Sequence, residues 1–111
     1  MKTPRERLQA YVVDVQDPDV SGMEHLEMLF NRSELAKVET RLTQEEQQAL
    51  ALADKQLLQQ AHAFYTAIAA IADLKSWRER KAEPPAHWWW YLDVLSAAPV
   101  TPVTTRLLVP A

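Results

Sequence analysis

The chain has 111 residues, of which 48% are hydrophobic and 24% are charged, a composition typical of one globular domain and unlike that of a disordered or fibrous chain. It contains a single glycine and no cysteine, which excludes glycine-rich phosphate loops, disulfide frameworks and cysteine-ligated metal sites. Its 12 basic and 15 acidic residues give a net charge of −3, which does not favour a general attraction to nucleic acid.

The first predicted helix covers 4–16. It opens on a capping box in which Thr3 is the N-cap, proline follows at the first helical position and Glu6 lies three residues after the cap. Apolar residues then recur at helical spacing, at Leu8, Tyr11, Val12 and Val15. The β-branched residues of this run leave a strand as the alternative, but the capping box favours a helix. Pro18 ends it, because the residue before a proline is disfavoured in the α conformation.

The second predicted helix covers 22–41 and begins with a second capping box, Ser21 with Glu24. Its apolar stripe changes phase near Ser33, which predicts a kink or a short break there. The turn before it, 17–22, resembles the opening of an EF-hand calcium loop, with oxygen-bearing side chains at the first, third and fifth positions and glycine at the sixth. Met28 stands where such a loop needs a bidentate glutamate, so we interpret the segment as a turn and cap without a metal.

The third predicted helix, 44–81, is the long central element of the predicted fold. Thr43 and Glu46 form its capping box, and the residues that recur at intervals of seven are Leu50, Leu57, Phe64 and Ile71. Its second half, 61–72, contains six alanines and is apolar nearly all round, which predicts burial on every face. An unbroken helix of this length would be about 60 Å long, whereas a compact domain of this size is roughly 35 Å across. We therefore expect a second copy of the chain to cover the excess, with a kink in the helix as the alternative.

The last predicted helix, 86–97, carries four consecutive aromatic residues, Trp88, Trp89, Trp90 and Tyr91. A strand is the alternative, because Trp and Tyr are strand formers. Successive helical residues point about 100° apart, so these rings cannot all face one core and at least one projects away from it. A protein interface is the favoured interpretation; a partly exposed core, a ligand pocket and a membrane-surface anchor are the others. The prolines after this helix predict an extended tail over 99–111.

No catalytic or metal-binding constellation stands out in the sequence. The three histidines, His25, His62 and His87, are not at metal-binding spacing, and we expect no metal and no cofactor. Basic residues lie near Trp77, but Glu79 and Glu83 interleave them, so we expect a solvated helix end and no nucleic-acid partner; the basic residues are Lys75, Arg78, Arg80 and Lys81. The chain opens without a secretory signal pattern, and its longest apolar stretch is too short to span a bilayer. Both features predict a cytoplasmic protein without a transmembrane segment.

These elements predict an all-α fold: a small helical bundle over 1–98 built on one long central helix, with a short aromatic helix and an extended tail over 99–111. We expect a non-enzymatic protein–protein interaction module, working as a homodimer that presents its aromatic segment to itself or to a protein partner. The alternative is a small-molecule binding protein, or an enzyme of unrecognised type, with an aromatic-lined helical pocket. The candidate interface or ligand residues are Phe64, Tyr65, Trp77, His87, Trp88, Trp89, Trp90 and Tyr91, of which the first five would line that pocket.

Overall fold

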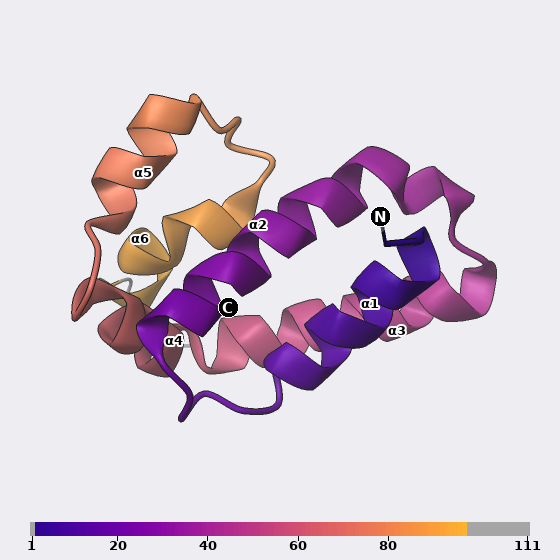
Figure 1. Cartoon of the computed structure of the whole chain (residues 1–111), viewed down its shortest axis with the longest axis horizontal. Coiled ribbons are helices and arrows are strands. Elements are labelled where there is room, and N and C mark those ends of the chain that lie inside the picture. The colour runs from indigo at the N-terminus through magenta and orange to yellow at the C-terminus, as the bar shows by residue number, and fades with distance from the viewer. Residues whose placement is uncertain (1, 98–111) are drawn as a thin grey trace, which may run out of the picture.

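The computed structural model describes residues 2–97, so the predicted tail over 99–111 lies outside the described residues. The described part is all-α: it has six α-helices, two 3-10 helices and no strand (Figure 1). In chain order the helices are α1 (Pro4–Asp14), α2 (Gly22–Val38), η1 (Glu39–Arg41), α3 (Gln44–Gln59), α4 (Ala61–Ala69), α5 (Leu74–Lys81), η2 (Trp88–Tyr91) and α6 (Leu92–Ala97). None of these helices is long and apolar enough to cross a membrane.

The helices begin where the hydroxyl side chains predict. The Thr3 hydroxyl accepts a hydrogen bond from the Glu6 backbone N–H at 3.1 Å, and the Glu6 carboxylate accepts one from the Thr3 N–H at 2.8 Å. Thr43 caps α3 with the same reciprocal pair. Ser21 caps α2 through its hydroxyl, but Glu24 accepts from that hydroxyl and not from the Ser21 backbone. The three predicted helix starts are confirmed, and two of the three capping boxes are complete.

The predicted long helix over 44–81 is divided into three. The backbone leaves the helical conformation at Gln60, where φ is −114° and ψ is 24°, and again in the turn over 70–73 before α5. The longest dimension of the molecule is 48 Å, less than the length of the predicted rod. The break at Gln60 turns α4 so that Phe64 packs edge-on against His25 of α2, 4.5 Å between ring centroids. Burial of Phe64 therefore outweighs the local helix propensity of the segment.

Two further expectations about helix packing are corrected. α2 is continuous through Ser33, because that side chain faces the core and does not cap a new segment. Segment 61–72 is not buried on every face: in α4 only Ala61, Phe64 and Ile68 are buried. The opposite face of α4 is exposed and carries mostly small side chains, which lose little by contact with water.

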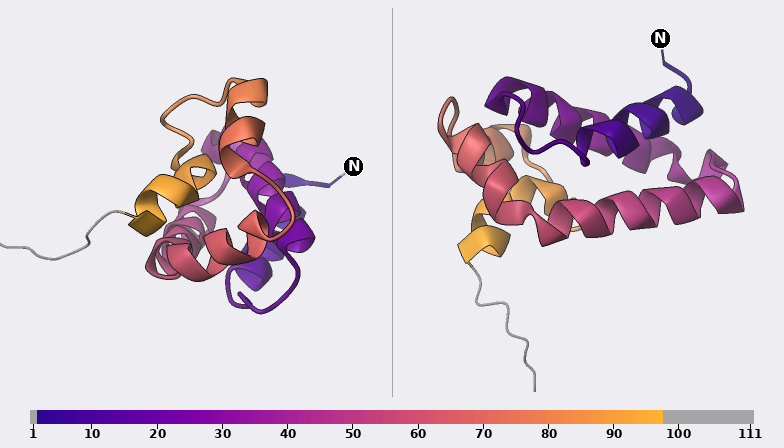
Figure 2. Two further views of the ribbon diagram at one scale, coloured as in Figure 1. Left: turned by 90° about the vertical axis from the view of Figure 1, so that its left-hand side faces the viewer. Right: turned by 90° about the horizontal axis from the view of Figure 1, so that it is seen from below.

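The helices form two layers with the core between them. α1 and α2 lie side by side and antiparallel, and α3 runs along the other side of the pair, as Figure 2 shows in its right-hand view. α4 packs against α2 and α6, and α5 contacts η2. The side chains buried most completely are Tyr11, Val15, His25, Met28, Leu29, Leu35, Leu57, Phe64, Ile68, Leu74, Trp90 and Leu92. Every α-helix from α1 to α6 therefore contributes to one core.

Gly22 lies where the first turn of α2 meets the end of α4. A Cβ atom at this position would overlap the carbonyl oxygen of Ala67 and would be 2.9 Å from Cγ1 of Ile71. The nearest obstacle is backbone, which a rotamer change cannot move aside. The single glycine of the chain is therefore required by the close approach of two helices.

Candidate functional site

The predicted aromatic residues lie in the core or at its edge. Phe64, Trp89 and Trp90 are buried within this chain, whereas five others are only partly buried: Tyr65, Trp77, His87, Trp88 and Tyr91. The expectation that at least one of the four consecutive rings projects away from the core is corrected: Trp88 and Tyr91 pack against the same core as Trp89 and Trp90, because η2 is contacted by α2, α5 and α6. The two central rings are used by the fold of a single chain, so they are not free to meet a partner.

The five residues of the predicted aromatic pocket are spread over separate contacts. Phe64 packs on His25, whereas Trp77 packs edge-on against Phe30 at 5.6 Å between centroids. The His87 ring stacks on Trp89 at 4.6 Å, and His87 Nδ1 lies 3.0 Å from a carboxylate oxygen of Glu83. These rings serve to pack helices against one another and are not brought together around one hollow.

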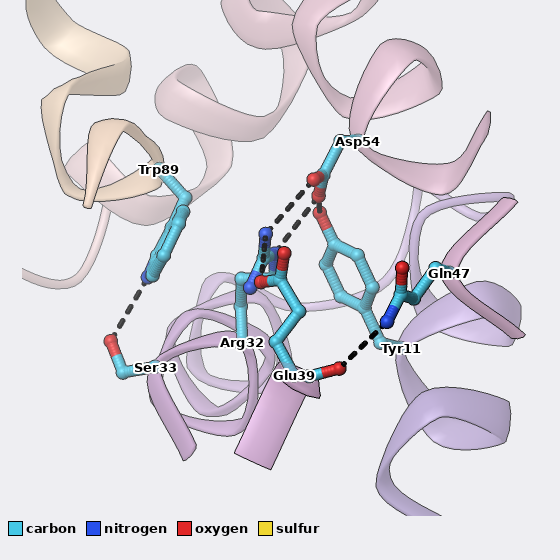
Figure 3. Close-up of polar contacts among 7 residues, drawn as sticks. All are labelled: Tyr11, Arg32, Ser33, Glu39, Gln47, Asp54 and Trp89. Carbon is cyan, nitrogen blue, oxygen red and sulfur yellow. Dashed lines mark hydrogen bonds and ion pairs between the residues drawn. The ribbon is translucent and has the colours of Figure 1, made fainter. Parts of the chain in front are cut away.

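Ser33 holds both buried tryptophans. The indole N–H groups of Trp89 and Trp90 both donate to the Ser33 hydroxyl, at 2.9 and 2.7 Å, and Figure 3 shows the bond from Trp89. A hydroxyl oxygen has two lone pairs, so one serine satisfies two buried donors. The sequence gives no signal for this contact, because it joins residues more than fifty positions apart.

A buried ion pair lies beside these rings (Figure 3). Arg32 donates from Nε and Nη2 to the two carboxylate oxygens of Asp54, at 2.9 and 3.0 Å, and the Tyr11 hydroxyl donates to the same carboxylate at 2.5 Å. The guanidinium carbon lies 4.2 Å from the centroid of the Trp89 ring. Arg32 Nη1 is buried without a hydrogen-bond partner among the described residues. The network joins α1, α2, α3 and η2.

The electrostatics of this network keep the Arg32 guanidinium charged and the Tyr11 phenol neutral. Burial alone lowers the pKa of Arg32, but hydrogen bonds to Asp54 and its negative charge outweigh burial and raise that pKa. Burial, with the charge of Asp54 as the second cause, raises the pKa of Tyr11 far above its ordinary value. The charges are mutually paired and the phenol is a fixed donor, so we interpret the network as a structural cross-link between helices.

A long groove follows the outer surface where α1 and α2 meet. It consists of two adjoining hollows with cavity volumes of about 550 and 420 Å³, which share the lining residues Lys2, Arg7 and Glu34. The first hollow is also lined by Ala10, Asp14, Glu24, Glu27, Phe30 and Asn31. The second is also lined by Thr3, Pro4, Lys37, Val38 and Arg41. We call this surface the α1–α2 groove.

The charges of the α1–α2 groove are separated along its length. One end, here the acidic end, is lined by three carboxylates, Asp14, Glu24 and Glu27. The other, the basic end, is lined by Lys37 and Arg41. Between them lie the shared residues, two cations and one carboxylate. The lining is therefore neutral in sum but strongly polarised from end to end.

Hydrogen bonds between α1 and α2 fix this arrangement. Arg7 Nη1 donates to the side-chain oxygen of Asn31 at 3.1 Å, and the Asn31 amide donates back to the Arg7 carbonyl at 2.9 Å. At the acidic end burial raises the pKa of Asp14; the carboxylates of Glu24 and Glu27 raise it further, while positive charge from Lys2 lowers it. The raised pKa of Asp14 thus reflects burial more than the neighbouring charges.

Sequence reasoning missed this groove, although a signal for it was present. The turn over 15–21 is short, and short connections make consecutive helices antiparallel neighbours. That pairing places the residues near position 7 beside those near 31, and the residues near 14 beside those near 24. The segregation of charge between the two ends is then a consequence of the sequence.

The described residues contain no group of three or more histidine, aspartate or glutamate side chains that could hold a metal ion. Comparison of the chain with protein-family models, with curated proteins and with solved structures gives no match. The function of this chain is therefore inferred from its own surface, on which the α1–α2 groove is the most distinctive feature.

Proposed function

We propose that this protein is a non-enzymatic helical interaction module that works as a homodimer, with the α1–α2 groove as its docking surface. The observation that carries the proposal is the separation of charge along an open groove formed by two adjacent helices. This surface takes the place of the aromatic segment in the predicted interface, because Trp89 and Trp90 are buried in the core of one chain.

The chemistry of the groove favours a protein partner over a small molecule. Small-molecule pockets are usually lined by apolar and aromatic side chains with a few polar groups. The α1–α2 groove instead has eight charged residues along its length, a pattern that orients and selects a macromolecular partner. Residues such as Glu24, Glu27, Lys37 and Arg41 are exposed, so contact with a partner requires no rearrangement of the core.

Location in the cytoplasm is part of this proposal, because a chain without cysteine is at no disadvantage in a reducing compartment. The alternative of a small-molecule binding protein or an enzyme with an aromatic pocket stays a prediction. The separate packing of Phe64, Trp77 and His87 does not favour that alternative.

The proposal is tested by the mass of the full chain in solution as a function of protein and salt concentration. We expect light scattering to give a mass that rises from 12.7 kDa towards twice that value through the micromolar range. Because the docking surface is charged, raising the salt from about 0.1 M to about 1 M, which shortens the Debye length from about 10 to about 3 Å, should weaken the association. A mass of one chain at high micromolar concentration in low salt would contradict self-association.

A further inference from the structure

The distribution of charge along the α1–α2 groove determines how a second copy would fit. A two-fold axis through the middle of the groove brings the same surface of two chains together with opposite directions. The acidic end of each copy then faces the basic end of the other. Two copies laid parallel would place like charges together, which is costly.

We propose that a second copy of this chain docks antiparallel on the α1–α2 groove, so that Lys37 and Arg41 of each copy face Asp14, Glu24 and Glu27 of the other. This inference rests on the self-association proposed above and specifies its surface and orientation. Helices α1 and α2 of one copy and the same two helices of the other would form one four-helix bundle across the two-fold axis.

The groove also supplies uncharged contacts that such a bundle needs. Ala10 and Phe30 line the first hollow, Val38 lines the second, and all three are only partly buried in one chain. An antiparallel second copy would cover these side chains while the charges beside them are paired. Protein interfaces commonly combine buried apolar contacts with charged groups in this way.

Asp14 lies in the acidic end where a cation of a second copy would be favourable. The carboxyl is partly buried beside Glu24 and Glu27, and its pKa is raised, with burial as the largest cause. A cation from a second copy would compensate that charge. Within the chain the basic end is well placed to donate, because Arg41 is exposed and Lys37 is an exposed residue whose ammonium pairs with the half-exposed Glu34 at 2.8 Å.

The size of the groove predicts a weak dimer. From Glu24 to Arg41 the surface is about 26 Å long at 1.5 Å per residue, and two neighbouring helices are about 20 Å wide. The contact is then about 500 Å² per copy, or roughly 1,000 Å² in total, which belongs to small and transient interfaces. We expect a dissociation constant in the micromolar range with a strong dependence on salt.

Charge reversal tests the orientation. One variant carries Lys37→Glu and Arg41→Glu, so that both ends of its groove are acidic; the other carries Glu24→Lys and Glu27→Lys, so that its acidic end becomes largely basic. Each variant alone should self-associate at least tenfold more weakly than the wild type in sedimentation equilibrium. An equimolar mixture should form a heterodimer. The chain with all four changes has an inverted groove and should regain the homodimer.

Matched controls separate this effect from a general effect of charge. Glu45→Lys lies in the first turn of α3, as Glu24 lies in the first turn of α2, and Lys55→Glu lies on the exposed back of α3. These changes should leave the self-association within twofold of the wild type. Circular dichroism confirms that each variant is folded. If a reversal disturbs the fold, the neutral variant Lys37→Gln with Arg41→Gln replaces it and should also weaken the dimer.

The possible failures are distinguishable. If the wild type dimerises and both reversal variants dimerise with the same affinity, another surface is used. The antiparallel docking would then be wrong, and self-association would stand. A wild-type chain that stays monomeric at high micromolar concentration in low salt would overturn both proposals. Loss of the dimer in the variants without rescue in the mixture or in the fourfold variant would overturn the antiparallel orientation.

Discussion

Ser33 is a single hydroxyl that accepts hydrogen bonds from two buried indoles, at 2.9 and 2.7 Å. Ser33→Ala removes the one acceptor that both indoles share and leaves two N–H donors unsatisfied in the core, at a cost of about 1–3 kcal/mol each. We expect a loss of about 2–4 kcal/mol in the free energy of unfolding, measured by urea denaturation. Ser96→Ala, whose hydroxyl contacts the exposed His62, is the control and should cost less than about 0.5 kcal/mol. Equal losses would show that Ser33 does not serve both rings.

Gly22 should not tolerate the smallest side chain. Replacing glycine by alanine in a helix usually stabilises a protein by about 0.4–1 kcal/mol. Here the new methyl group would overlap the Ala67 carbonyl oxygen, so α2 and α4 would have to move apart. We expect Gly22→Ala to destabilise the protein by about 2 kcal/mol or more in thermal or chemical unfolding. Gln44→Ala, at the corresponding first position of α3, should be nearly neutral; a neutral or stabilising Gly22→Ala would refute the close approach.

At the scale of the helices, the pair Arg32–Asp54 connects α2 to α3 and Tyr11 adds α1. Asp54→Asn leaves the buried guanidinium with only the more distant carboxylate of Glu39, 3.7 Å from Nη2, and should cost about 3 kcal/mol. Tyr11→Phe removes one hydrogen bond to a charged group and should cost about 1.5–3 kcal/mol. Replacing Arg32 by Met and Asp54 by Leu together should recover much of the loss, because no buried charge then remains.

Chemical denaturation gives the free energy of unfolding of these three variants, and Glu34→Gln is the control. That change breaks a surface pair with Lys37 and should cost under about 1 kcal/mol. If Asp54→Asn were as mild as this control, the buried pair would not be a cross-link between helices.

The stability of the start of α5 should depend on pH, because its N-cap residue is a carboxylate, Asp73. Asp73 caps it, and the hydrogen bond from the Ser76 hydroxyl, with that from the Ser76 N–H, lowers the pKa of Asp73. A carboxyl whose pKa is lower in the folded than in the unfolded chain stabilises the fold above its unfolded pKa, and that stabilisation is lost as the pH falls through the folded value. Asn is also a good N-cap but does not titrate.

Asp73→Asn should therefore have a melting temperature below the wild type at about pH 6 and a smaller difference, or none, at about pH 2.5. Glu79→Gln removes an exposed carboxylate from the same helix without touching the cap and is the control. A difference for Asp73→Asn that stays constant across this range would exclude an electrostatic contribution from the cap.

The sequence predicts helices better than it predicts their breaks. Thr3, Ser21 and Thr43 mark three helix starts because a cap depends on residues only three positions apart. The break at Gln60 depends on where Phe64 is buried, which is a matter of packing between distant segments. The turn before α5 had a local signal that was missed: Asp73 is an N-cap residue type inside an alanine-rich run.

The same distinction explains the candidate site. The pattern of four aromatic residues wrongly predicts that one ring projects away from the core, because it does not reveal that Ser33 and Arg32 take up Trp89 and Trp90 or that Trp88 and Tyr91 pack against the same core. The α1–α2 groove depends on side chains that are polar and exposed, and such positions give no periodic signal. Their meaning appears only when α1 and α2 are known to be antiparallel neighbours.

At the scale of the whole molecule, the chain has a net charge of −3, yet the charges that line the α1–α2 groove sum to zero. A uniformly acidic surface would repel its own copies. A groove with one acidic and one basic end avoids that repulsion on the one face where contact is proposed. The excess negative charge lies elsewhere in the chain, where it opposes association through other faces.

The bonds from Trp89 and Trp90 to Ser33 join positions 56 and 57 residues apart, and they tie the unfolding of η2 to that of α2. The buried face of α2 is not complete until η2 has closed over it, so partial unfolding that releases η2 exposes Ser33, Arg32 and the core together. We expect one two-state transition, with tryptophan fluorescence and far-ultraviolet circular dichroism superimposing during urea denaturation. Two separated transitions would mean that the C-terminal turn detaches on its own. A chain cut after Pro85 should populate a loosely packed, helical state that binds apolar dyes.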